Sequence, residues 1–147
     1  MAVVQGNKAL TDFTVRSGER FVSQYYDVLN SAKAEMHHFY GPAAVVVWNG
    51  FPVPASSLQA FFSSSLPVAK FSTTSVDCQP VPGVLPGSDG NTAMANILVA
   101  VAGEIDYGKN VIKTFSQTFL LVQDTSKPKA VFIIASDTFR EVGATTE

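Results

Sequence analysis

Few side chains in this 147-residue sequence have the chemistry of a catalytic group. Asp77 and Asp137 are carboxylates in β-rich runs, and Tyr25, Tyr26 and His38 lie in helical runs. If a curved sheet and its helices enclosed a pocket, a carboxylate and a tyrosine or histidine inside it could transfer protons. Carboxylates near strand ends more often act as structural hydrogen-bond acceptors, so we rank the catalytic interpretation below the structural one.

The two histidines are adjacent in sequence, at His37 and His38. On a helix, adjacent side chains point about 100° apart, so the pair does not readily bind one metal ion. The sequence also lacks a Gly-rich phosphate loop, a dinucleotide fingerprint and a Gly-x-Ser-x-Gly elbow. We therefore predict no metal, no cofactor and no catalytic residue.

A single cysteine, Cys78, excludes an intramolecular disulfide and favours a reducing compartment. It lies in a strand-like run, where we expect it to be a small buried hydrophobe. No apolar stretch approaches the ~20 residues of a transmembrane helix, and the N-terminus lacks the apolar core of a signal peptide. The expected location is the nucleus and cytoplasm, away from membranes.

The composition indicates a single domain, residues 1–147, that hides some of its surface. Apolar residues make up 46% of the chain and charged residues only 15%, whereas charged residues usually reach about a quarter. That deficit fits a subunit of an oligomer. The formal net charge of −2 argues against an independent RNA-binding patch, although a patch formed jointly with a partner stays open.

The first part of the chain is helical in pattern. We predict a loose arm at residues 1–7, then a helix over about residues 8–29 with apolar residues at three- and four-residue steps. Gly18 lies within this helix and suggests close packing against a sheet. A shorter helix ends before Gly41-Pro42, and a third, capped by Ser56 or Ser57, ends at Pro67.

The remainder is typical of strands. Asn49-Gly50 predicts a hairpin between Ala43–Trp48 and a short return strand that begins at Phe51. Four long strands follow, over about residues 70–79, 92–105, 111–123 and 131–140, with a surface loop over 81–91 and a turn at Pro128. The predicted class is α+β, a curved antiparallel sheet with three helices packed on one face.

The closing hairpin, Val111 to Arg140, is the most informative stretch. Alternation in its last strand places every second side chain, from Phe132 to Arg140, on one face, and places Asp137 and Phe139 on the other face. Both faces are apolar at the start of the strand, so both should be covered. The protein's own helices cover one, and we expect a second protein on the other. The set facing that protein is Phe132, Ile134, Ser136, Thr138 and Arg140.

Several motifs together resemble the nuclear transport factor 2-like family. They are Tyr25-Tyr26, Trp48-Asn49-Gly50, the stretch Leu58 to Pro67, Asp77 to Val81, Phe115-Ser116-Gln117-Thr118-Phe119 and Ala135 to Arg140. Within the family they are most similar to the small subunit of the general mRNA export receptor, of the mRNA transport regulator type. The resemblance covers about residues 10–140.

This resemblance implies a cone-shaped fold and an adapter without catalytic activity. The family small subunit pairs sheet to sheet with the large export subunit, and the pair carries mRNA, and in fungi pre-ribosomal particles, through the nuclear pore. It does so by binding phenylalanine-glycine repeats of nucleoporins. Arg140 matches the family's interface arginine, which faces an acidic partner residue. Gln117, Phe115 and Phe119 match the family's interface strand, although the facing of that strand is open.

Two other functions remain open at this point. A homodimeric carrier that imports Ran-GDP would use acidic residues near the pocket mouth, where Glu104 and Asp106 lie, although Lys109 is close by. A small isomerase or dehydratase would need an open pocket lined by Asp77 or Asp137. The loop over 81–91 has no basic residue, which argues against direct RNA contact by that loop.

Overall fold

The computed structural model describes residues 2–81, 96–124, 126–127 and 131–142. Most of the predicted loop over 81–91, and the turn at Pro128, lie outside these residues. The helical elements are α1 (Ala2–Ser31), η1 (Lys33–Phe39), η2 (Ala55–Ser57), α2 (Leu58–Ala60) and η3 (Phe61–Ser65). The strands are β1 (Tyr40–Trp48), β2 (Phe51–Val53), β3 (Lys70–Val81), β4 (Asn96–Asp106), β5 (Ile112–Gln123) and β6 (Phe132–Val142).

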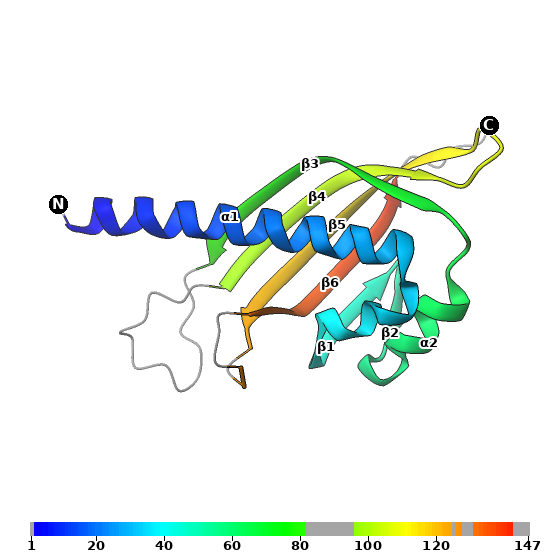
Figure 1. The fold of residues 1–147 in the computed structure, drawn as a ribbon, viewed down its shortest axis with the longest axis horizontal. Coiled ribbons are helices and arrows are strands. Elements are labelled where there is room, and N and C mark those ends of the chain that lie inside the picture. The colour runs from blue at the N-terminus through cyan, green and yellow to red at the C-terminus, as the bar shows by residue number, and fades with distance from the viewer. Residues whose placement is uncertain (1, 82–95, 125, 128–130, 143–147) are drawn as a thin grey trace.

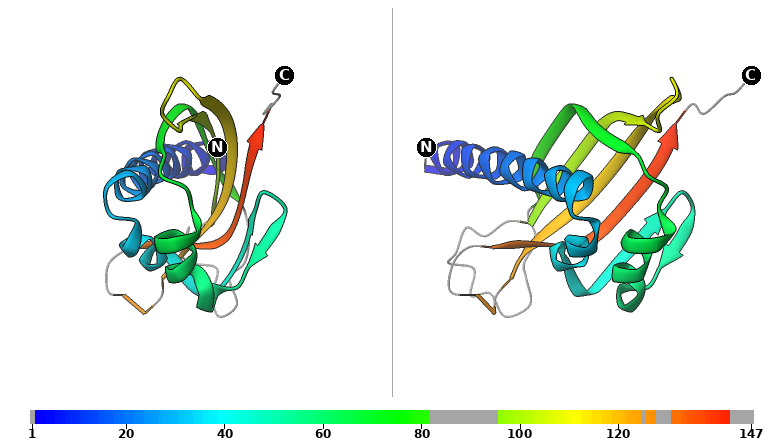
Figure 2. Two further views of the ribbon diagram at one scale, coloured as in Figure 1. Left: turned by 90° about the vertical axis from the view of Figure 1, so that its right-hand side faces the viewer. Right: turned by 45° about the vertical axis from the view of Figure 1, so that its right-hand side comes forward.

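One curved sheet and a helical layer make up the molecule. The long helix α1 crosses one face of the sheet, and the shorter helical elements lie beside β1 and β2 (Figure 1). Figure 2 shows how the sheet curls around the helical side. This arrangement confirms the predicted α+β class with helices on one face.

The sheet is mixed, not wholly antiparallel as predicted. Its strand order is β2-β1-β6-β5-β4-β3. The hairpin β1–β2 joins the four long strands through β6, and β1 runs parallel to β6, with Val46 beside Asp137 and Trp48 beside Phe139. The sequence pattern locates each strand but does not tell which neighbours pair, so it could not predict this single parallel pairing.

The helix α1 begins at Ala2, so residues 2–7, predicted as part of a loose arm, are helical. Ala2 and Gln5 are good helix formers, but Val3, Val4, Gly6 and Asn7 are not, so propensity did not predict this extension. Further along, one stripe of α1 is buried against the sheet, as the three- and four-residue spacing predicted. The buried residues are Thr14, Gly18, Phe21, Val22, Tyr25, Tyr26 and Leu29.

Gly18 is the point of closest approach between α1 and the sheet. A Cβ atom added there would lie 2.4 Å from Cys78 Sγ and 3.1 Å from Cys78 Cβ, so a larger residue does not fit without a shift. The predictions for Gly18 and for a buried Cys78 are both confirmed, since the cysteine is 9% exposed. At the far end of α1, the Asn30 side chain exchanges two hydrogen bonds with the Phe71 backbone, which secures the helix to β3.

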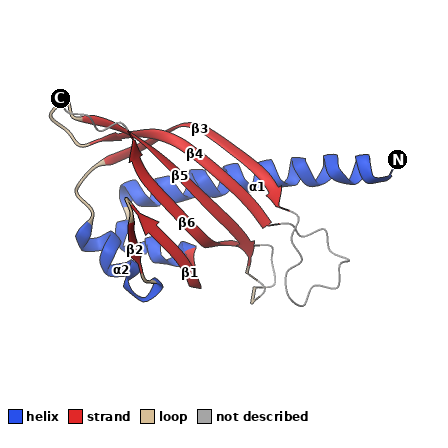
Figure 3. Cartoon of the chain, turned by 180° about the vertical axis from the view of Figure 1, so that it is seen from behind, coloured by secondary structure: helices blue, strands red, loops and turns tan. Residues whose placement is uncertain are grey.

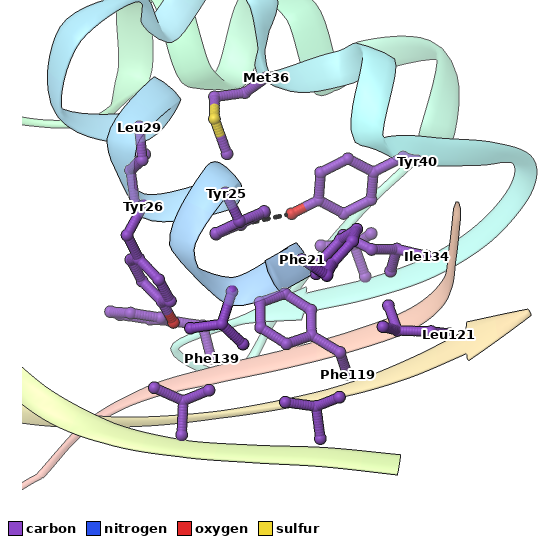
Figure 4. Packing of buried hydrophobic residues seen from close by; sticks show 14 of the residues in the cluster. Phe21, Tyr25, Tyr26, Leu29, Met36, Tyr40, Phe119, Leu121, Ile134 and Phe139 are labelled. Atoms are coloured by element: carbon purple, nitrogen blue, oxygen red, sulfur yellow. Dashed lines mark hydrogen bonds between the residues drawn. The ribbon is translucent and has the colours of Figure 1, made fainter. Parts of the chain in front are cut away.

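Aromatic side chains fill the space between the sheet and the helical elements. Trp48 stacks on Phe139 with ring centroids 4.0 Å apart, and Phe61 and Phe62 of η3 pack on the other side of the tryptophan. Figure 4 shows Phe21 and Tyr25 of α1 directed toward Phe119 of β5. The interior of the cone is therefore filled by the protein's own side chains around this core.

Candidate functional site

The opposite face of the sheet is open. Seen from behind, strands β3 to β6 lie in front and α1 passes behind them (Figure 3). We call this surface the outer face. Its residues are Val45, Val47, Ser136, Thr138, Arg140, Ser116, Thr118, Leu120, Leu98, Ala100, Ala102, Glu104 and Asp77.

A β-bulge changes which residues of β6 reach the outer face. Leu120 pairs with Ser136 and Leu121 with Ile134, so Ala135 is the extra residue and the alternation shifts by one. Ile134 is therefore fully buried in the core instead of lying beside Ser136. Phe132 also faces the helices, where its ring packs 6.3 Å from Phe13 of α1. The predicted facing of these two residues was wrong.

The sequence left the facing of β5 open, and the structure turns the three residues predicted to contact a partner into the core. Phe115, Gln117 and Phe119 all point toward α1 and are at most 2% exposed. Their strand neighbours Ser116 and Thr118 point to the outer face. The aromatic residues of β5 therefore belong to the core of this chain and offer no surface to a partner.

The centre of the outer face carries no charge. Thr138, Thr118 and Ala100 form a row across three strands, with Leu120 and Leu98 in the row beside it. A lack of charged side chains at the centre of a surface is typical of the buried part of a protein interface. Exposed aliphatic side chains lie toward β1, where Val45 is 64% exposed, and at the other end of the sheet, where Ile112 and Val142 are 57% and 45% exposed.

Arg140 lies on the outer face toward the end of β6. It is paired across the sheet with Ser116, an uncharged neighbour. Among the described residues no carboxylate lies within ion-pair distance of its guanidinium. Glu104 and Asp106 lie on the outer side of β4, at the same end of the sheet, and both are exposed. Arg140 is thus available to a carboxylate on another chain.

On the opposite side of the same strands, five polar side chains form a buried cluster. Tyr40 Oη donates to Asp137 Oδ2 at 2.5 Å, and Gln117 Nε2 donates to Asp137 Oδ1 at 2.8 Å. Tyr25 Oη lies 2.7 Å from Tyr40 Oη, and Tyr26 Oη donates to Gln117 Oε1 at 2.5 Å. These links tie α1 and β1 to the middle of β5 and β6. We call these five residues the polar cluster.

Burial changes the acid–base behaviour of the polar cluster. Loss of hydration raises the pKa of Asp137 to about 7, although the hydrogen bonds from Tyr40 and Gln117 oppose the rise. Burial, together with the Asp137 charge, raises the pKa values of Tyr25 and Tyr40 well above the usual 10.0. The tyrosines therefore stay protonated while Asp137 titrates near neutral pH.

The structure does not bring all the catalytic candidates together. Tyr25, Tyr26 and Asp137 meet in the polar cluster, but Asp77 is on the outer face, where Gln79 Nε2 donates to it at 3.0 Å. His38 is exposed and lies 3.3 Å from Glu35 Oε1. The described residues contain no group of three or more His, Cys, Asp or Glu side chains that could hold a metal ion.

Hollows around the core do not reach Asp137. One of about 730 Å³ lies between α1, η1 and the start of β6, lined by Phe13, Phe39 and Phe132 among others. Another of about 590 Å³ lies between β2, η3 and the Trp48–Phe139 stack. Asp137 is 0% exposed and lines neither, so no substrate in either hollow could touch its carboxylate.

Sequence reasoning missed Tyr40 and misplaced Gln117. The signal for Gln117 was available, because the alternation Phe115-x-Gln117-x-Phe119 places an amide on an apolar face. A polar residue on a buried face needs partners. Tyr40 carried no such signal, since it lies at the start of β1 beside a helix end.

The fold, the open sheet face and the filled cone define a class of protein. The chain matches the nuclear transport factor 2 (NTF2) domain over residues 17–141, and it belongs to that family. It is 31% identical over 140 residues to NTF2-related export protein 2 of Bos taurus, covering 95% of each chain. In the residues that the structure describes, no helix is long and apolar enough to span a membrane.

Solved structures with the same fold include other nuclear transport proteins. Nuclear transport factor 2 of Cryptosporidium parvum has a TM-score of 0.69 and 25% identity, with 87% of this chain and 94% of that chain covered. A chain of the Candida albicans Mtr2–Mex67 M domain complex has a TM-score of 0.60 and 13% identity, covering 91% and 99%. Together with the export-protein relatives, these similarities support a role in nuclear transport.

Proposed function

We propose that this protein is the non-catalytic small subunit of a heterodimeric mRNA export receptor. Its outer face would dock, sheet to sheet, on the matching domain of a large subunit. The observation that carries the proposal is the outer face itself, where an uncharged centre lies beside Arg140, which has no ion-pair partner among the described residues. The relatives named as export proteins point to the same process.

The composition of the outer face suits close docking of two sheets. Threonine, serine and alanine at Thr138, Thr118, Ser116 and Ala100 are small, so a second sheet can approach to the ~10 Å spacing of packed sheets. The face is less apolar than the sequence suggested, because Phe132 and Ile134 turn inward. That composition still favours an interface, since protein interfaces as a whole are only about as apolar as the rest of the surface.

Arg140 lies at the edge of this contact and would orient the two sheets relative to each other. A guanidinium can hold a carboxylate through two parallel hydrogen bonds, which fixes the register of the two sheets. The proposal therefore requires an acidic residue on the partner opposite Arg140. Ser136 and Thr138, which lie on the same strand as Arg140, would also contact the partner.

We further propose that the protein has no catalytic activity. Asp137, the carboxylate of the polar cluster, is sealed in the core, and Asp77 faces the other way. The relatives are transport factors, which agrees with an adapter. The phenylalanine-glycine nucleoporins remain expected partners of the heterodimer, which would shuttle between nucleus and cytoplasm. With a formal charge of −2, the chain would contact RNA only jointly with its partner.

A homodimeric carrier of Ran-GDP is the second candidate. It is favoured by the exposed carboxylates Glu104 and Asp106 at the end of β4, and by the similarity to a nuclear transport factor 2 structure. In that case the outer face would contact a second copy of the chain.

Binding measurements with both partners separate the two candidates. The purified chain is titrated by calorimetry with the large export subunit and, separately, with Ran-GDP. The proposal predicts a one-to-one complex with the large subunit and no heat with Ran-GDP. Binding to Ran-GDP that Glu104→Ala and Asp106→Ala abolish, with none to the large subunit, would replace the proposal by the second candidate.

A further inference from the structure

The charged side chains of the outer face are unevenly distributed. Arg140 lies on β6, whereas β4 and β3 carry three carboxylates and one lysine on this face. These are Glu104, Asp106, Asp77 and Lys70. Strand β5 runs between β6 and β4, and its outer-face side chains from Ile112 to Leu120 are uncharged. The outer face therefore has a positive side and a mainly negative side, with a neutral strand between them.

Glu104 has no charged group directly opposite it in its own chain. Across the sheet it lies between Ser72 of β3 and Thr114 of β5, which are both uncharged. Asp106, by contrast, lies directly opposite Lys70 of β3. Glu104 is exposed, and among the described residues no cation lies within ion-pair distance of its carboxylate. Its charge is therefore available to another chain.

Arg140 and Glu104 lie apart on the outer face and do not neutralise each other. Arg140 lies opposite Ser116 of β5, and Ser116 lies opposite Ala102 of β4. Glu104 follows Ala102 by two residues on the same side of β4. Two strand spacings and two residues of rise place the Cα atoms of Arg140 and Glu104 about 12 Å apart. That distance exceeds the Debye length of about 8 Å at physiological ionic strength, so the two charges interact weakly in the free chain.

We propose that Glu104 is a second charged anchor of the outer face, and that the large subunit places a basic side chain opposite it. The partner would then carry a carboxylate over β6, facing Arg140, and a cation over β4, facing Glu104. These two groups would lie about 12 Å apart, as their counterparts do here. The inference rests on the proposed function, because it requires the outer face to be the interface with the large subunit.

Two opposite charges fix the orientation in which the sheets dock. With Arg140 as the only anchor, the partner could rotate about it, because Thr138 and Thr118 at the centre carry no charge to oppose the rotation. With Glu104 as a second anchor, a half-turn of the partner would place its cation against Arg140 and its carboxylate against Glu104. Like charges brought together in an interface are unfavourable, so only one orientation is stable.

A second copy of this chain is the competing occupant, since it carries the same two charges. In a symmetric pair, Arg140 of each copy would face Glu104 of the other copy. An exchange of the two charges separates these occupants. The charge-swapped variant, Arg140→Glu with Glu104→Arg, would still match a second copy of itself, but it would oppose like charges in the large subunit.

Calorimetry with the large subunit tests the anchor in the full chain. Glu104→Gln should weaken binding about tenfold, and Glu104→Lys at least about a hundredfold. The charge-swapped variant should also bind at least about a hundredfold more weakly, although its net charge of −2 equals that of the wild type. The control Glu19→Lys makes the same change of net charge as Glu104→Lys, on the exposed side of α1. It should bind within about twofold of the wild type, because its charge is screened from the interface.

The outcomes separate this inference from the proposed function. If Glu104→Lys and the charge-swapped variant form the one-to-one complex as tightly as Glu19→Lys, Glu104 is not an anchor and the proposed function still stands. If the wild type does not bind the large subunit, both fail together. The mass of the chain alone, measured by light scattering after size exclusion, tests the second copy. A wild-type dimer that Glu104→Lys dissociates and the charge-swapped variant preserves would assign both charges to a second copy and overturn the inference.

Discussion

Arg140 is the single residue on which the proposed docking depends most. Replacing Arg140 with alanine should weaken binding to the large subunit by about 2–5 kcal/mol, at least about thirtyfold, because an opposing carboxylate would be left buried and unpaired. Arg140 is exposed in the free chain, so the free energy of unfolding should change by less than about 0.5 kcal/mol. Calorimetry and thermal unfolding measure the two quantities.

The matched control is Arg16→Ala, which removes an exposed arginine from α1, away from the outer face. It should leave the affinity unchanged. An Arg140→Ala variant that binds the large subunit as tightly as Arg16→Ala would mean that Arg140 contacts only solvent in the complex.

Asp137 makes stability depend on pH in a defined direction. Its pKa is raised from 3.8 to about 7 in the folded chain, so between these values the folded state holds a proton that the unfolded state has released. Stability attributable to Asp137 is therefore present at low pH and is lost as the pH rises to about 7.

The variant Asp137→Asn should remove this dependence. The free energy of unfolding of the wild type should fall relative to the variant as the pH rises, by up to about 4 kcal/mol in total, and the difference should level off above about pH 7. Urea unfolding at a series of pH values measures the difference. Parallel curves for the two proteins would show that Asp137 does not titrate in the core.

For single residues, the sequence predicted which side chains form a polar group better than it predicted the face of the sheet on which each side chain lies. Tyr25, Tyr26 and Asp137 were identified as a potential group, and they do meet. Ile134 was assigned to the wrong side, and Gln117, named for the partner interface with its facing left open, lies in the core. One unpaired residue, Ala135, reverses the alternation of β6, and a bulge of that kind leaves no mark in a short apolar run.

Among the elements, the contact of α1 with β3 can be tested at Gly18. Gly18→Ala improves helix propensity by about 1 kcal/mol, but the new methyl group would overlap Cys78. Overpacking typically costs about 1–3 kcal/mol, so the variant should be less stable than the wild type. Denaturant unfolding gives the change in free energy.

A double-mutant cycle with Cys78→Ala isolates that overlap. Removing the sulfur removes the atom that would lie 2.4 Å from the new methyl group, so Gly18→Ala should be far less harmful in the Cys78→Ala background. Additive effects of the two changes would show that α1 and β3 lie further apart than described.

The hairpin β1–β2 is held to β6 by its turn. Asn49 has a φ of 52°, which an asparagine tolerates better than an alanine, and Gly50 follows with a φ of 86°. The Asn49 side-chain oxygen accepts from the Glu141 backbone N–H at 2.8 Å, and the Asn49 backbone N–H donates to the Phe139 carbonyl at 2.8 Å. The turn thus fixes the end of β6 that carries Arg140.

Asn49→Ala should lower the free energy of unfolding by about 2–3 kcal/mol, because it loses the bond to Glu141 and strains the backbone. Asn49→Gly loses the same bond without the strain and should cost roughly half as much. Thermal unfolding compares the two. Equal losses of stability in the two variants would show that backbone strain at position 49 does not affect the free energy of unfolding.

The elements themselves were largely predictable from the sequence. The spacing of Phe21, Tyr25 and Leu29 marks α1, and the Asn-Gly turn marks the hairpin. The parallel pairing of β1 with β6 was not predictable, because strand partners far apart in sequence are chosen by the packing of the whole sheet. The start of α1 was missed because Val3, Val4, Gly6 and Asn7 are poor helix formers, so propensity there does not predict a helix.

At the scale of the whole molecule, two layers leave one side uncovered. Helices bury one face of the sheet, and none of the described helices covers the other face (Figure 3). That face presents Thr138, Thr118 and Ala100. The hollows on the helical side lie away from this face, so docking of the outer face would leave them accessible. The proposed function requires that another chain binds to the outer face.

A single substitution at the centre of the outer face tests this claim most directly. Thr118→Arg places an unpaired charge where the docked sheet would lie, while Gln59→Arg places the same charge on α2 as a control. The molar mass of each variant mixed with the large subunit is measured by light scattering after size exclusion. Gln59→Arg should form the one-to-one complex and Thr118→Arg should not; a complex of full mass with Thr118→Arg would contradict the account.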